Sequence, residues 1–172
     1  MPKFKGIKIL AVLCLVVFLF CGCSNFRLSS SIDDLISPIS PSGDNAGVQS
    51  AVDEYCKGGY SIKIPATGNY TTSFILKDID GDKINEAVAF YEPSNKVGTI
   101  SMAVIKKSGE RWSVIANVDG TATDVNSVDF CDFNNDGKME IIVCWSVVSK
   151  QTGTSINVYS QNENDGKYSL KP

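Results

Sequence analysis

Histidine is absent from this chain of 172 residues. The absence excludes Ser–His and Cys–His nucleophile pairs and zinc sites built on histidine, which carry out much of common hydrolytic chemistry. An excess of positive charge is missing as well, because 16 Lys and Arg residues stand against 19 Asp and Glu residues, for a net charge of −3. Such a balance does not favour nucleic acid as a partner. Since the sequence also has no nucleophile–base pair and no phosphate-binding loop, we expect a protein that is not an enzyme and does not bind nucleic acid.

Cysteine is too sparse and too irregular for a disulfide framework. Six cysteines occur, and three of them lie within the first 23 residues. The other three are Cys56, Cys131 and Cys144. An odd number at irregular spacing does not predict a set of disulfide bonds. We therefore expect no disulfide framework, with Cys131 and Cys144 as free, buried thiols.

Residues 1–22 have the pattern of an export signal, with lysines in the first eight positions followed by a largely apolar segment over 7–20. That segment is too short to span a bilayer comfortably. The small residues at positions −2 and −1 before Cys23 resemble a bacterial lipobox, although Phe20 stands at −3, where Leu is usual. The resemblance implies that Cys23 is the lipidated first residue of the mature protein, anchored at the extracytoplasmic face of a bacterial cell membrane. An ordinary cleaved secretory signal is the alternative.

The next segment, residues 23–44, is dominated by Ser, Pro and Gly. This composition predicts a flexible tether between the membrane and a folded domain. Scattered Leu35, Ile36 and Ile39 leave open a loop that packs on the domain.

An acidic loop of nine residues occurs twice, at 78–86 and 132–140. Both copies place oxygen-bearing side chains at loop positions 1, 3, 5 and 9, namely Asp78, Asp80, Asp82 and Glu86 in the first and Asp132, Asn134, Asp136 and Glu140 in the second. Alternate side chains of a tight loop converge on one point, and several hard oxygens around a point suit a hard cation such as Ca²⁺. The alternative is a pair of acidic turns that bind no ion.

The pattern around the loops predicts short strands and one helix. We expect a helix over 45–57, and strands over 60–64, 70–76, 87–91, 98–104, 112–116, 128–131, 141–145, 153–159 and 168–170. The segments are then a lead-in over 45–69, a first repeat unit over 70–118 and a second over 119–172. A four-stranded antiparallel unit that recurs every fifty-odd residues is typical of a β-propeller blade. We predict an all-β fold with two four-stranded propeller-like blades, a partial propeller, preceded by a short helix.

These residues resemble the FG-GAP or VCBS repeat of integrin-alpha-like proteins, over roughly residues 70–172. The resemblance implies up to two Ca²⁺ sites, whose ligands would be the eight side chains named above and the backbone carbonyls of Ile84 and Lys138 at loop position 7. Position 6 is occupied by Lys83 in the first loop and Gly137 in the second, and we expect a positive φ there. An EF-hand or dockerin-type loop is the rival, but it needs a carboxylate at position 12 and a following helix, and both copies lack both.

Two blades do not close a ring, so three arrangements stay open: a shortened relative of a longer repeat protein, an oligomer, or two sheets packed as a sandwich. We favour a partial propeller with the N-terminal helix and strands covering one side. Charged residues at 106, 107, 110 and 111 are predicted to be ordinary turn residues. Large aromatic side chains are predicted to be blade core and not an exposed sugar-binding platform, namely Tyr91, Trp112, Trp145 and Tyr168.

The sequence thus favours a lipid-anchored, Ca²⁺-stabilised surface module with a binding or structural role. Its partner would be a surface protein or a glycan. The alternatives are a carbohydrate-active accessory domain or a truncated remnant of a longer repeat protein.

Overall fold

A computed structural model describes residues 43–120, 122–148, 152–161 and 168–170. The chain divides into two compact units, Met1–Ile39 and Ser40–Pro172, and all of the described residues belong to the second. The predicted signal, the tether and the lipidation site at Cys23 lie outside the described residues. Within the described ranges, no helix has the length and hydrophobicity that a membrane crossing requires.

The described part contains one helix followed by nine strands. Their bounds are α3 (Asp44–Tyr55), β1 (Tyr60–Lys63), β2 (Ile75–Lys77), β3 (Glu86–Pro93), β4 (Ser101–Ser108), β5 (Arg111–Asp119), β6 (Asp124–Cys131), β7 (Glu140–Val148), β8 (Thr152–Gln161) and β9 (Tyr168–Leu170). The mainly β composition and the short helix before the strands confirm the predicted all-β class.

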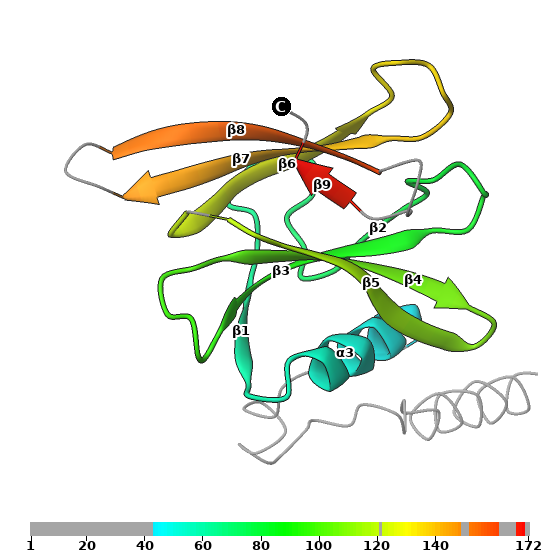
Figure 1. Ribbon diagram of the computed structural model, residues 1–172, viewed down its shortest axis with the longest axis horizontal. Helices are drawn as coiled ribbons and strands as arrows, with labels where there is room; N and C mark the ends of the chain where they lie inside the picture. The colour runs from blue at the N-terminus through cyan, green and yellow to red at the C-terminus, as the bar shows by residue number, and fades with distance from the viewer. Residues whose placement is uncertain (1–42, 121, 149–151, 162–167, 171–172) are drawn as a thin grey trace, which may run out of the picture. The chain divides into compact units, whose positions relative to one another are not determined.

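The strands form two antiparallel sheets (Figure 1). The second sheet has the order β6-β7-β8-β9, and the first has the order β1-β3-β4-β5 with β2 also beside β3. The series β2–β5 and β6–β9 therefore repeat one topology, in which an acidic loop joins the first two strands. This arrangement is consistent with the predicted partial propeller, but the first sheet has five strands where four were predicted.

The extra strand arises because β1 and β2 share one edge of β3. The register pairs β2 with Glu86–Val88 and β1 with Phe90–Pro93. This sharing also shortens β2, since the prediction of a strand over 70–76 is wrong and only Ile75–Lys77 forms one. Residues before Ile75 have no free edge to pair with, because β1 already occupies β3 from Phe90 onward.

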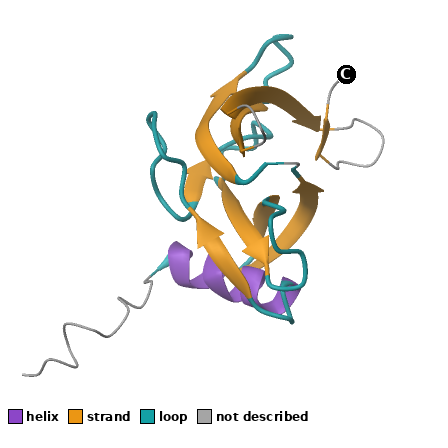
Figure 2. Ribbon diagram, turned by 90° about the vertical axis from the view of Figure 1, so that its left-hand side faces the viewer, coloured by secondary structure: helices purple, strands orange, loops and turns teal. Residues whose placement is uncertain are grey.

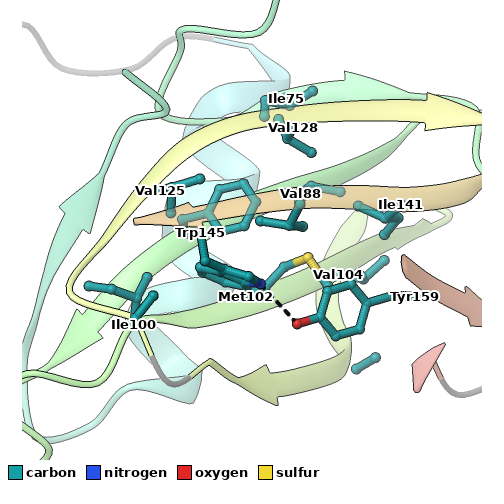
Figure 3. Packing of buried hydrophobic residues seen from close by; sticks show 14 of the residues in the cluster. Ile75, Val88, Ile100, Met102, Val104, Val125, Val128, Ile141, Trp145 and Tyr159 are labelled. Carbon is teal, nitrogen blue, oxygen red and sulfur yellow. Dashed lines mark hydrogen bonds between the residues drawn. The ribbon is translucent and has the colours of Figure 1, made fainter. Parts of the chain in front are cut away.

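Each face of the first sheet is covered by apolar side chains from another element. Helix α3 packs Val48, Ala51 and Val52 against one face, with the spacing of a single helical stripe (Figure 2). The opposite face meets the second sheet in a continuous core (Figure 3), whose buried side chains include Ile75, Val88, Phe90, Met102, Val104, Val125, Ile141, Val143 and Trp145. The first sheet is thus the middle layer of the described unit.

The large aromatic side chains belong to these cores, as predicted. Trp145 is 2% exposed, and its Nε1 donates a hydrogen bond to the Tyr159 hydroxyl at 3.2 Å (Figure 3). Tyr91 and Trp112 are also buried, against α3. The side chain of Tyr168 lies outside the described residues. An exposed aromatic platform is therefore not formed by the three that are described.

The cysteines at 56, 131 and 144 are free, as predicted. The strand register pairs Cys131 with Glu140 and Cys144 with Ser127, so the two cysteines of the second sheet do not face each other. The prediction that Cys131 and Cys144 are buried is wrong, because Cys131 is exposed and Cys144 is only half-buried. Side chains alternate along β6, and it is the neighbouring Phe130 that packs against the core.

Candidate metal sites

The first loop, residues 78–86, is wrapped around its own carboxylates. Asp78 at position 1 accepts hydrogen bonds from the backbone N–H groups of Gly81 at 2.8 Å and Lys83 at 3.0 Å. Asp82 at position 5 accepts one from the N–H of Ile84 at 2.8 Å. Short acidic side chains commonly bond to backbone groups a few residues ahead in this way. The aspartate spacing therefore shapes the loop as well as supplying oxygens.

The second loop, residues 132–140, repeats two of these three contacts, those from the N–H groups of loop positions 6 and 7. The Asp132 carboxylate accepts from the N–H groups of Asp136 at 3.2 Å and Gly137 at 3.0 Å. Asp136 accepts from the N–H of Lys138 at 2.8 Å. The amide of Asn134 at position 3 donates to Asp136 at 2.9 Å, a bond that an aspartate at this position could not make. Both loops thus have one backbone design, with an amide in place of a carboxylate in the second.

Two positions in each loop have left-handed backbone. Position 6 has φ of 70° at Lys83 and 85° at Gly137, which confirms the prediction. Position 4 has φ of 80° at Gly81 and 57° at Asn135, which the sequence pattern did not predict. Glycine and asparagine accept this conformation readily, whereas a lysine there costs about 1 kcal/mol. Each loop therefore has one glycine at a left-handed position, but only the first combines it with a strained lysine.

The glutamate at position 9 is buried in both loops. Glu86 is fully buried and Glu140 is 4% exposed. Each accepts a hydrogen bond at 3.0 Å from the backbone N–H of loop position 2, Ile79 or Phe133. The other oxygen of Glu86, Oε1, has no hydrogen-bond partner among the described residues. A buried carboxylate is costly unless a cation balances it, so this oxygen points to one.

Lys106, which was predicted to be an ordinary turn residue, supplies positive charge to the first loop. Lys106 lies in β4, where Ala87 pairs with Ile105, so Lys106 stands opposite Glu86 at the end of the ladder. Its Nζ contacts the carboxylates of Asp80, of Asp82 at 2.8 Å and of Glu86 at 3.3 Å. Burial by itself lowers the pKa of the Lys106 ammonium, but these carboxylates together raise it above its ordinary value. No motif in the sequence marks this contact, because it depends on the register of the hairpin formed by β3 and β4, which the structure shows.

The first loop gathers donors that fit a hard cation. One carboxylate oxygen from each of Asp78, Asp80 and Glu86 lies within 4.8 Å of the other two. Hard oxygen donors of this kind are what Ca²⁺ prefers. Asp82 is turned instead toward Lys106 and the N–H of Ile84. The residues present therefore fit the predicted ion, while the roles of the Ile84 and Lys138 carbonyls stay predictions.

The two loops touch each other, which brings both predicted sites to one place in the fold. The backbone N–H of Met139 in the second loop donates to the carbonyl of Ile79 in the first, at 2.7 Å. At Gly81 a β-carbon would lie 2.5 Å from the carbonyl oxygen of Gly137. Close approach of the loops therefore requires a glycine at position 4 of the first loop, in addition to its positive φ.

A family model, that of the FG-GAP-like repeat, matches residues 78–143. The match begins at position 1 of the first loop and ends in β7, so it contains both loops and the strands between them. No curated protein and no solved structure matches the chain. The chain therefore contains an FG-GAP-like repeat, in a propeller-like all-β fold.

Proposed function

We propose that this chain is a Ca²⁺-stabilised FG-GAP-type repeat module with a binding or structural role, and not an enzyme. One observation carries the proposal: two acidic loops with the same backbone contacts stand at the two ends of the matched repeat. The side chains that would hold the ions are those at positions 1, 3, 5 and 9 of each loop, with the carbonyls of position 7. An ion bound there would supply positive charge next to buried glutamates.

The ion would act on folding, because a ligand that binds the folded chain alone stabilises it by mass action. Each loop connects two strands of one sheet, β2 to β3 and β6 to β7. The carboxylates at position 1 hold the loop backbone, and the glutamate at position 9 joins the loop to the next strand. Binding would therefore strengthen the strand pairing at the two loops.

A thermal melt of the full-length chain, purified in a mild detergent, tests this proposal. The midpoint is compared in chelator and in millimolar Ca²⁺, for the wild type and for D136N. The proposal requires a rise in midpoint with Ca²⁺ that D136N largely loses. A cooperative melt indifferent to both Ca²⁺ and the substitution would reject it, and the absence of any cooperative melt would favour a truncated remnant.

The membrane part of the proposal places the module on the extracytoplasmic face of a bacterial membrane through lipid on Cys23. Its support is the basic start, the short apolar segment and the small residues before that cysteine. Mass spectrometry of the N-terminal peptide tests it directly. C23S should move the protein from the membrane to the soluble fraction, with C21S as the matched control. Equal membrane retention of both variants would contradict lipidation at Cys23.

A glycan is a second candidate ligand, and one pocket favours it. The pocket has a volume of about 340 Å³ and lies between the end of α3 and strands β3–β5. Its lining combines the half-exposed ring of Tyr55 with the polar side chains of Asn117 and Asp119. An apolar ring beside a few convergent polar groups is a usual feature of small-molecule sites. Loss of binding to a glycan array in Y55A, but not in an exposed control variant V97A, would support this candidate.

A further inference from the structure

We propose that Lys106 is the resident cation of the first loop, so that its ammonium group and a Ca²⁺ ion exclude each other there. The inference rests on the proposed function of the loops as Ca²⁺ sites. In the wild-type protein the first loop would then be closed by its own lysine, and the second loop would be the main ion site.

The first argument is the position of the ammonium group. Lys106 Nζ contacts the carboxylates at positions 3, 5 and 9, which are Asp80, Asp82 and Glu86. These are three of the four side chains predicted to hold the ion. The group is also partly shielded from solvent, because the Lys106 side chain is 30% exposed and that of Glu86 is 1% exposed. The ammonium group therefore stands among the ligands themselves and not at the rim of the loop.

The second argument is that two cations do not fit on the same oxygens. Ca²⁺ needs six to eight oxygens at about 2.3–2.6 Å. Glu86 Oε1 is the buried oxygen that makes no hydrogen bond in the described part, and it lies 3.3 Å from Lys106 Nζ. An ion bound to that oxygen would lie within a few ångströms of the ammonium group, where repulsion is strong and poorly screened. Ca²⁺ binding thus requires the lysine to withdraw.

The third argument comes from the two repeats. In the second sheet Ile141 pairs with Tyr159, so Ser160 stands opposite Glu140 as Lys106 stands opposite Glu86. Loop position 3 changes in parallel, from Asp80 to Asn134. Counting these positions alone, four carboxylates and one ammonium give −3 in the first loop, and three carboxylates give −3 in the second. The lysine and the additional aspartate therefore occur together, as expected if they are partners.

The apparent affinity of the first loop for Ca²⁺ would equal its intrinsic affinity multiplied by the fraction of time that the lysine is withdrawn. The first loop would keep its shape without an ion, because Lys106 already contacts three of its four carboxylates. Removing the lysine should convert it into a competent divalent site with four carboxylates.

Calorimetric titration of the full-length chain in detergent with Ca²⁺ tests this inference. The variants are K106Q, which removes the charge, and K107Q as the matched control. Lys107 is the next residue of β4, but its Nζ contacts Asp44 at 2.8 Å and not the loop. We expect K106Q to bind one more equivalent than the wild type, at an affinity roughly tenfold or more above that of the wild-type first loop. D78N should abolish the added equivalent, and K107Q should leave the titration unchanged.

The same titration in the wild-type background covers the case in which K106Q does not fold. There, D78N should leave the bound equivalents unchanged and D136N should remove them. Loss of the ion in D78N but not in D136N would overturn the inference, and so would a folded K106Q with no gain. A wild type that binds no Ca²⁺ at all would reject the proposed function, yet a gain in K106Q that D78N abolishes would still support the role of Lys106.

Discussion

The two repeat units share a strand order and a loop design, but they differ in what surrounds them. At loop position 2, Ile79 is completely buried whereas Phe133 is 60% exposed. Ile79 lies beneath the second unit and accepts a hydrogen bond from its loop, while Phe133 has no described element over it. The outer face of the first sheet is covered by α3, and on the second sheet Ile156 is 69% exposed. The local sequence pattern therefore determines the loop backbone, while the burial of loop position 2 depends on the neighbouring repeat unit.

A second difference lies in charge. The first loop has Lys106 among its carboxylates, and the second has Ser160 at the corresponding position of its hairpin. Equal loop backbones therefore do not make equal sites.

The largest loss of stability should come from a substitution at loop position 2 of the first loop. I79A should lower the free energy of unfolding by about 2–4 kcal/mol, because it opens a cavity between the two sheets. F133A removes a side chain that is mostly in solvent, and a change within about 1 kcal/mol is expected. Urea denaturation of both variants measures the difference. Equal losses of stability would mean that Phe133 is buried in solution. The two repeat units would then not differ in the burial of loop position 2.

A smaller difference in stability is expected between alanine substitutions at the glycines of the two loops. G81A places a β-carbon against the Gly137 carbonyl as well as forcing a positive φ, and we expect a loss of about 2–3 kcal/mol. G137A meets no atom within 4 Å, so only its positive φ matters and about 1 kcal/mol is expected. Thermal melts report both values. A G137A variant less stable than G81A would contradict the close approach of the loops.

Replacing Lys83, the strained lysine of the first loop, by glycine should stabilise the protein. K83G should raise the free energy of unfolding by up to about 1 kcal/mol, since a positive φ costs glycine little. V97G, at an exposed position in the turn between β3 and β4, would report how far a glycine alone shifts the stability of an unrelated turn. Chemical denaturation in chelator keeps ion binding out of the comparison. A destabilised K83G would mean that the lysine side chain makes contacts that outweigh its strain.

The smallest expected effect is on the pH dependence of stability, and it concerns a residue of the first repeat unit. A hydrogen bond from Lys96 at 2.5 Å, followed by one from Ser101, holds the pKa of Asp119 below its ordinary value. A lowered pKa in the folded state means that stability is complete above the unfolded pKa, near 4, and is lost as the pH falls through the folded value. The pair is partly exposed, so about 0.5 kcal/mol or less is expected. In D119N the free energy of unfolding should fall less between pH 5 and about 2 than it does in the wild type. An unchanged pH dependence would exclude this contribution.

Much of the fold follows from local pattern, and the structure bears this out at particular residues. The strands after each loop, the positive φ at Lys83 and Gly137, and the buried Trp145 were all predictable, because each depends on alternation or on contacts within a few residues. The acidic spacing alone also indicated where carboxylates of the first loop converge.

Only the tertiary structure decided how these parts meet. The shared edge of β3 shortened β2, the hairpin register brought Lys106 to the loop, and the packing of the sheets placed Ile79 beneath the second loop. Each of these joins residues that are distant in the chain, so no local pattern encodes it. Hydrogen bonds within nine residues shape each loop by itself, whereas its burial and its balancing charge come from elements that fold against it.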